Sequence, residues 1–196
     1  MKNLLKMTVA MAVVAIFSVI HVFAINPETT TIKKIIIKGN ATVFLVQRDK
    51  EAVVIKDTYD PDKTSVTVNG ISLLINSTEK EPVTIVVYAK SPFRIEASNT
   101  SYVKTMGVFN LPYLQVFVSD NARAEINTTT QSLYTRVNQL ATLQMSGVSD
   151  EHFMVRSNDA KVKMDKLYCM KTSTSYFRPY KIDKSKLTAE NLKVNR

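Results

Sequence analysis

The chain has 196 residues, and its 26 Lys and Arg residues against 17 Asp and Glu residues give a formal net charge of +9. Glycine, with only 4 residues, is too scarce for glycine-rich phosphate-binding loops or a low-complexity chain. A lone cysteine, Cys169, forms no internal disulfide, and with 2 histidines it supplies too few ligands for a zinc site. We therefore expect neither a metal nor a cofactor, and we interpret Cys169 as a buried, small apolar residue.

Residues 1–24 have the features of a secretory signal. Two lysines flank the start of an apolar run that extends from Met7 to Phe23. We predict cleavage before Ile25, which leaves residues 25–196 as a single domain. An uncleaved membrane anchor is the alternative, because the run approaches the length that spans a bilayer.

Export and charge together narrow the class of partner. Loss of the two lysines with the signal leaves 24 basic and 17 acidic residues, a net charge of about +7. A basic surface outside the cytoplasm suits anionic neighbours such as lipopolysaccharide or an acidic polysaccharide. We expect no nucleic-acid partner, because the chain contains no recognisable nucleic-acid-binding module.

Residues 32–90 are typical of paired strands. Runs of β-branched and aliphatic residues alternate with polar ones from Ile32, and turn signals separate the runs. Asn69 and Gly70 form the dipeptide that a tight hairpin requires, since both positions tolerate positive φ. We expect these strands to form a strand-rich N-terminal cap that protects one end of the fold.

From Arg94 onward one short strand is repeated four times. The segments are RIEASNTSYVKT, QVFVSDNARAEI, YTRVNQLATLQM and MVRSNDAKVKM, and the small residue of each falls about twenty residues after the last. The aligned small residues are Ser101, Ala122, Ala141 and Ala160. Such a period predicts an all-β fold, a single-stranded parallel β-helix (solenoid) of about four or five coils whose apolar faces are buried by stacking.

Polar residues precede each small residue and predict the corners of the coils. Asn99, Asp120, Asn138 and Asn158 fall at equivalent places, the third with a slip of one residue. Asn and Asp tolerate left-handed backbone and bond to their own turn, so we interpret them as a stacked ladder of corners.

The alternation after each corner predicts two outward rows of side chains. One row contains Tyr102, Arg123, Thr142 and Lys161, and the next contains Lys104, Glu125, Gln144 and Lys163. Aromatic, cationic and amide side chains in such rows suit glycans or anionic polymers. The candidate binding face therefore consists of Tyr102, Lys104, Arg123, Gln144, Lys161 and Lys163.

The opening IKKIIIKGNATVFLVQ, the paired strands and the SDNA and SNDA turns resemble the putative auto-transporter adhesin, head GIN domain family of bacterial envelope proteins. The resemblance extends from Ile32 to about Lys166. It implies an exported β-helix with Ser-Gly turns and a role in adhesion, and it carries over no catalytic residues. Only Met145-Ser146-Gly147 keeps the Ser-Gly form, since Asn or Asp stands at the other corners.

Catalytic constellations are poorly supported. His152 falls in the row of Phe93, Leu114 and Leu133, so we interpret it as a packing residue rather than as a base acting with Cys169. The carboxylates Asp120, Asp150 and Asp159 belong to turns, and Glu125 is alone in its row, so paired carboxylates for glycoside cleavage are not evident.

We therefore predict a non-enzymatic, exported module of the periplasm or bacterial cell surface that recognises glycan or lipopolysaccharide. Two alternatives stay open. One is a passive envelope scaffold that self-associates as a homo-oligomer, and the other is a polysaccharide-cleaving enzyme on the same scaffold. A membrane contact would follow only from an uncleaved signal.

Overall fold

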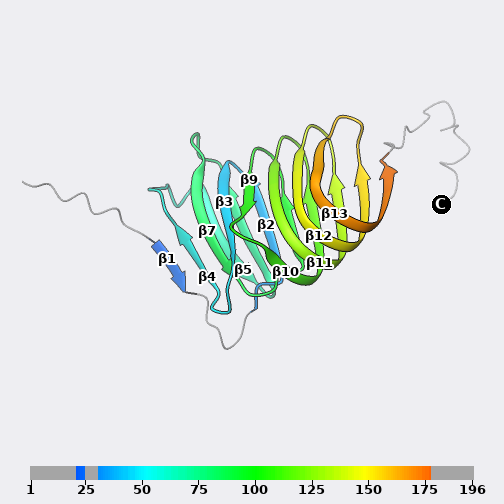
Figure 1. Cartoon of the computed structure of the whole chain (residues 1–196). Helices are drawn as coiled ribbons and strands as arrows, with labels where there is room; N and C mark the ends of the chain where they lie inside the picture. The colour runs from blue at the N-terminus through cyan, green and yellow to red at the C-terminus, as the bar shows by residue number, and fades with distance from the viewer. Residues whose placement is uncertain (1–20, 25–30, 178–196) are drawn as a thin grey trace, which may run out of the picture.

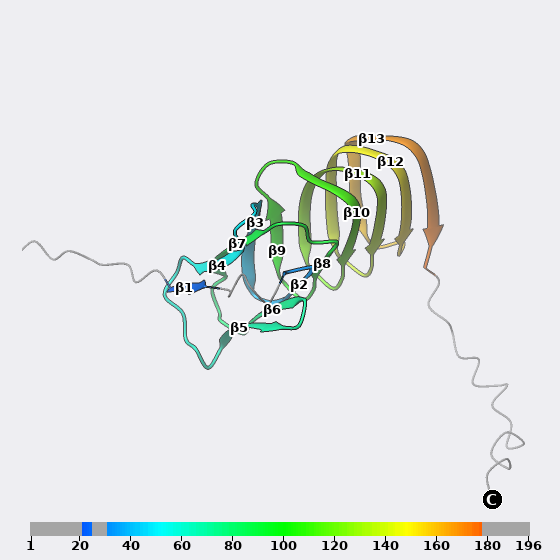
Figure 2. The ribbon, with the colours of Figure 1, turned by 90° about the horizontal axis from the view of Figure 1, so that it is seen from below.

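The computed structural model describes residues 21–24 and 31–177. These residues form one curled 13-stranded β-sheet and no helix (Figures 1 and 2). Accordingly, the described residues contain no helix that is long and apolar enough to cross a membrane. The all-β prediction is confirmed.

The sheet is built of coils, each with two arms that meet at a corner. An entry arm leads into the corner and an exit arm leaves it, and the arms of successive coils pair in parallel (Figure 1). The entry arms are β6 (Ser72–Ser77), β2 (Lys34–Gly39), β8 (Arg94–Ala97) and the last parts of β10 (Phe109–Val118), β11 (Arg123–Val137), β12 (Thr142–Arg156) and β13 (Lys161–Tyr176). The exit arms are β7 (Val83–Ala89), β3 (Ala41–Gln47), β9 (Tyr102–Thr105) and the first parts of β11, β12 and β13.

Parallel pairing follows the register expected from the repeat. Arg123 lies opposite Tyr102 and Thr142, and Thr142 lies opposite Lys161. The small residue before each of these positions is therefore stacked on its equivalent, and Ala122 and Ala141 are fully buried. A small side chain is needed at this place because two arms converge there.

The N-terminal strands differ from the predicted cap. β2 and β3 are themselves a coil inside the stack, since Ile35 pairs with both Leu73 and Ile95. The order in space is thus β6–β7, then β2–β3, then β8–β9. Only antiparallel strands lie beyond β6 and β7 at this end, namely β5 (Thr64–Asn69) on β6, β4 (Ala52–Ile55) on β7, and β1 (His21–Ala24) on β4.

The predicted hairpin is confirmed at the edge of the stack. Asn69 pairs with Ser72 across the turn between β5 and β6, and Gly70 has φ +55°. That angle lies in the left-handed region, which a glycine adopts without strain.

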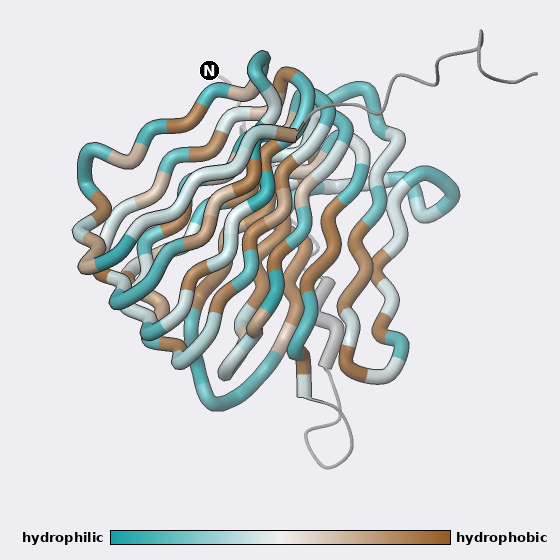
Figure 3. Tube along the Cα trace, turned by 90° about the vertical axis from the view of Figure 1, so that its right-hand side faces the viewer, coloured by the Kyte–Doolittle hydropathy of each residue, from teal (hydrophilic) through white to brown (hydrophobic). Residues whose placement is uncertain are grey.

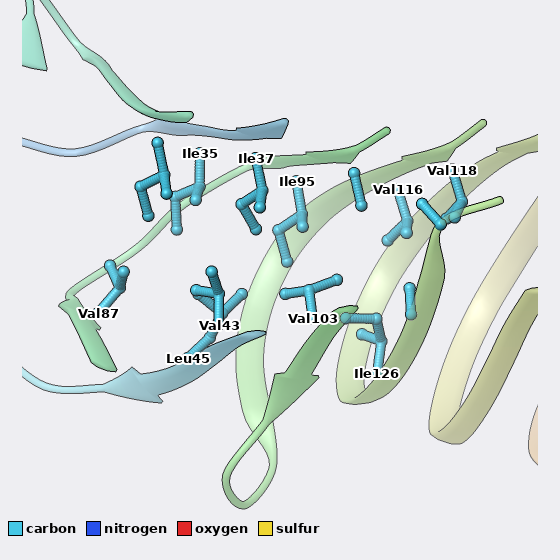
Figure 4. Close-up of a cluster of buried hydrophobic side chains, with 14 of the residues drawn as sticks. Ile35, Ile37, Val43, Leu45, Val87, Ile95, Val103, Val116, Val118 and Ile126 are labelled. Atoms are coloured by element: carbon cyan, nitrogen blue, oxygen red, sulfur yellow. The ribbon is translucent and has the colours of Figure 1, made fainter. Parts of the chain in front are cut away.

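Inward side chains of both arms form the core. Every second residue of the arms points inward, and stacked aliphatic residues such as Ile35, Ile95 and Val116 face Val43 and Val103 (Figure 4). Seen from the β13 side, the chain trace alternates between hydrophilic and hydrophobic along the arms (Figure 3). Burial of one such Ile or Val side chain contributes about 1.5–3 kcal/mol, so the repeated rows supply most of the driving force for stacking.

The corners form the predicted ladder, with one correction. Asn99, Asp120 and Gln139 have φ of 62°, 60° and 58°, so the third left-handed corner residue is Gln139 and not Asn138. The backbone N–H of Asn99 donates to the Asp120 carboxylate at 2.8 Å, and that of Asp120 donates to the Gln139 side-chain oxygen at 2.8 Å. The corners at Asn99 and Asp120 are therefore each held by a side chain of the next coil. Asn158, at the equivalent place in the following coil, is not among the residues with positive φ.

Candidate functional site

The six residues of the predicted binding face lie together on the exit arms. We call this surface, made of Tyr102, Lys104, Arg123, Gln144, Lys161 and Lys163, the cationic face. The two predicted rows are formed by direct backbone pairing of β9, β11, β12 and β13. Their side chains point outward, because the residues between them, such as Ala124 and Leu143, are buried.

Glu125 organises the charges of the cationic face. Its carboxylate bonds to Lys104 Nζ at 3.1 Å and to an Arg123 guanidinium nitrogen at 2.5 Å, and Arg123 also lies 5.6 Å from the centre of the Tyr102 ring. Partial burial acts to raise the pKa of the Glu125 carboxyl, but hydrogen bonds from Lys104 and Arg123 outweigh it and hold the pKa below its usual value. The carboxylate thus stays ionised and offsets part of the positive charge that a ligand would meet.

The β13 end of the cationic face is more exposed to solvent than the rest of it. Lys161 and Lys163 on β13 are exposed, whereas Tyr102, Lys104 and Gln144 are half-buried. A cation with an exposed head group retains its attraction for an anionic polymer but is screened by salt. Positive charge available to a ligand is therefore concentrated toward the C-terminal coil.

A shallow hollow of about 220 Å³ opens beside the cationic face. Lys104, Glu125 and Gln144 line it from the predicted rows, and Ser146 and Lys166 line it from the next paired positions of β12 and β13. Lys166 was not predicted from the sequence, because an irregularity in the β12–β13 register shifts the positions after Lys163 by one residue.

The entry arms carry a second row of interest that the sequence reasoning missed. Arg94 lies 4.0 Å from the centre of the Phe117 ring, and the Phe117, Tyr134 and Phe153 rings follow with centroid distances of 5.5 and 5.8 Å. We call these three rings the aromatic row. Tyr134 pairs directly with Phe153, whereas Phe117 pairs with Arg136. The signal that could have found part of this row is therefore the aromatic residue at the same position of two successive repeats.

His152 and Cys169 do not form a catalytic pair. Cys169 pairs with Ser149, whereas His152 pairs with Leu133 on one side and Thr172 on the other. The predicted row of His152 is confirmed, and the side chain is only 2 % exposed. Cys169 is half-buried rather than buried, because no further coil covers β13 within the described residues.

Burial governs the chemistry of His152. Its Nε2 lies 2.9 Å from Thr135 Oγ1, and burial lowers the pKa of the imidazole below the ordinary value of 6.5. The ring is therefore neutral at physiological pH and acts as a packed, hydrogen-bonded core residue.

Three carboxylates near the N-terminal end of the stack hold local structure together. A hollow lined by Asp57, Asp60, Glu79 and Glu81 lies near the N-terminal end. Asp57 accepts the Thr84 N–H at 2.7 Å and Glu79 accepts the Asp60 N–H at 2.7 Å, while Asp60 is paired with Lys63. No group of three or more His, Cys, Asp or Glu residues suited to a metal ion occurs in residues 21–24 and 31–177.

Comparison with known structures supports the observed fold. A putative adhesin from Bacteroides fragilis superposes with a TM-score of 0.67 at 13 % identity, covering 81 % of this chain and 75 % of the other. A putative lipid binding protein from Parabacteroides distasonis gives a TM-score of 0.58 at 13 % identity over 80 % and 78 % of the two chains. A putative adhesin from Parabacteroides merdae gives 0.56 at 11 % identity over 81 % and 77 %.

Sequence comparison identifies the family. No significant match to a curated protein was found. Residues 32–176, which comprise all the strands from β2 to β13, match the family described as "Putative auto-transporter adhesin, head GIN domain". The chain therefore belongs to the putative auto-transporter adhesin, head GIN domain family.

Proposed function

We propose that the protein is an exported, non-catalytic adhesion module that binds anionic glycans of the cell envelope through the cationic face. The observation that carries the proposal is the pair of outward rows, in which polar, aromatic and cationic side chains recur from coil to coil. We further infer that the coils form a single-stranded parallel β-helix, which would make these rows a straight, repeating surface.

The related structures support this class of function. Two of them are described as putative adhesins and one as a putative lipid binding protein. Lipopolysaccharide carries both an acidic glycan and a lipid, so it is the ligand that we would test first. A periplasmic or cell-surface location follows from the same proposal, because such ligands lie outside the cytoplasm.

Affinity would come from many weak contacts. Strands of adjacent coils lie about 4.8 Å apart, so a polymer laid along the stack meets a new pair of side chains at each coil. Each exposed contact between a cation and an anion contributes about 0.5 kcal/mol and weakens with salt. Binding should therefore be modest, selective for long anionic chains and sensitive to ionic strength.

An enzymatic role receives no support from the cationic face. Its carboxylate, Glu125, is kept ionised by Lys104 and Arg123, whereas a general acid for glycoside cleavage must hold its proton near neutral pH. Lys104 and Arg123 favour binding of an anion instead.

The test is binding to immobilised lipopolysaccharide and to an acidic polysaccharide, measured at low and high salt. Removal of two positive charges in Arg123→Ala with Lys161→Ala should weaken binding roughly fivefold, because two contacts of about 0.5 kcal/mol are lost. Conversely, Glu125→Gln should strengthen binding, because it removes the carboxylate that neutralises Lys104 and Arg123.

A matched control removes the same charge elsewhere. Lys56 and Lys80 are exposed near the N-terminal end, so Lys56→Ala with Lys80→Ala should leave affinity nearly unchanged. Equal losses in the control and in the Arg123 and Lys161 variant would show that only net charge matters and would remove the cationic face as a site.

A further inference from the structure

The last coil presents an unpaired edge. β13 extends over 16 residues and pairs with β12 alone among the described strands. Its outer N–H and C=O groups therefore face away from the stack along both arms. At the opposite end, antiparallel strands β4 and β5 cover the terminal arms. An exposed strand edge of this length is a ready template for pairing with another chain.

The core is also open at this edge. Val162 and Met164 point inward from β13 but are only partly buried, whereas Leu143 and Met145 on β12 are almost completely buried. Leu167 and Cys169 also point inward from this strand, Cys169 pairing with fully buried Ser149, and they too are only half-buried. Apolar side chains at the end of a stack are normally covered by a capping layer.

The charges of β13 identify a second copy as the cover. In an antiparallel pair with Tyr168 opposite the Tyr168 of a second copy, Asp165 lies opposite Lys171, and symmetry gives this pair twice. Lys163 then lies opposite Ser173, so neither Lys163 nor Lys171 faces another lysine. A shift of the symmetry axis to Leu167 would instead place Lys163 opposite Lys171. Opposite charges across strands stabilise a pair and like charges destabilise it.

This register also matches the two faces of the coil. Val162 lies opposite Thr174, and both occupy inward positions, since Thr174 pairs with buried Met154. Outward Lys161 likewise lies opposite Ser175. The entry arm of one copy therefore covers the exit arm of the other, with inward side chains meeting inward ones.

We propose that the protein forms a twofold dimer in which the β13 edges of two copies pair in antiparallel fashion about Tyr168. The two sheets become continuous, and the open ends of both cores close against each other. Such an interface is isologous, because the same strand contributes from each copy. The dimer does not depend on the proposed ligand, so failure of either proposal leaves the other intact.

The register is tested by disulfide trapping in the full chain, exported and purified from an expression host. In a Cys169→Ser background, Tyr168→Cys places two thiols directly opposite each other, at the 4.5–5.5 Å Cα separation that is typical of antiparallel pairs and suits a disulfide. We expect a covalent dimer under mild oxidation. Ser173→Cys in the same background is the matched control and should stay uncrosslinked, because its two copies lie on opposite arms.

Charge exchange tests the same interface without a new cysteine. Asp165→Lys or Lys171→Asp should each weaken dimerisation about tenfold in sedimentation equilibrium, since two attractive pairs become repulsive. Lys171 also pairs with Glu151 of its own chain at 3.5 Å, so the compensating variant combines Asp165→Lys and Lys171→Asp with Glu151→Lys and should restore dimerisation. A wild-type chain that stays monomeric at all micromolar concentrations would overturn the proposal, as would equal crosslinking of the two cysteine variants or failure of the compensating variant to recover.

Discussion

At the scale of single residues, His152 makes the stability of the fold depend on pH. Its imidazole is buried with a lowered pKa, so the unfolded chain binds a proton more readily than the folded one. The free energy of unfolding should therefore be fully retained above pH 6.5 and should fall as the pH drops below that ordinary value. Urea denaturation at a series of pH values between neutral and mildly acidic would measure the fall.

The variant His152→Leu separates this effect from other titrating groups. Leucine matches Leu133, which pairs with His152, and Leu114 in the coil before it. Its unfolding free energy should lose the pH dependence near neutrality, although loss of the Thr135 hydrogen bond should cost about 1 kcal/mol at every pH. An unchanged slope in this variant would assign the pH dependence to other residues.

At the scale of elements, close approach between coils fixes where a side chain is tolerated. Gly147 on β12 has φ +110°, and a methyl group there would overlap the carbonyl oxygen of Thr128 on β11. Gly147→Ala should therefore destabilise the fold by about 3 kcal/mol or more, through both backbone strain and the steric overlap.

Gly107 provides the matched control for that substitution. It has φ +94°, but a methyl group there meets no atom within 4 Å. Gly107→Ala should thus cost only the backbone term, about 1 kcal/mol. Equal urea midpoints for the two variants would show that the approach of β11 to β12 does not limit side-chain size.

Sequence reasoning succeeded for those elements that are repeated locally. Each repeated exit arm follows a small residue and then alternates between inward and outward positions. Aligning the repeats on that small residue correctly predicted that Arg123 pairs with Thr142 and that Thr142 pairs with Lys161. It failed for β2 and β3, although Ala41 stands at the place of Ser101, because their corner at Gly39 and Asn40 is shorter than the four-residue corners of the later repeats. The membership of these strands in the stack depends on pairing with residues far along the chain, which no local pattern reports.

The candidate site was predicted in part for the same reason. Membership of the two outward rows follows from strand alternation, and the backbone pairing brings all six residues of the cationic face into those rows. Glu125 neutralises Lys104 and Arg123 only because their side chains bend toward it, and strand alternation does not specify such side-chain conformations. Lys166 depends on the irregular register after Lys163.

At the scale of the whole molecule, the predicted signal and the observed strands overlap. β1 comprises His21–Ala24 and pairs with β4, yet cleavage before Ile25 would remove it. We expect the exported protein to begin at Ile25, which would leave β4 as the outermost strand on its side. N-terminal sequencing of the exported protein checks this. A protein that retains residues 21–24 would instead keep β1 as the edge and favour an anchored form.

The spatial order of the coils imposes an order on folding. β2 and β3 are the first coil in the chain, yet their neighbours on both sides, β6–β7 and β8–β9, come later. The first coil therefore has no neighbouring coil until β6 and β7 have emerged, and its other side stays open until β8 and β9 follow, so the nucleus forms from segments distant in sequence. Such nucleation is slow, because a long loop must close before any contact forms. Once it exists, β10 to β13 add one after another on a finished template, so growth proceeds in the direction in which the chain is delivered.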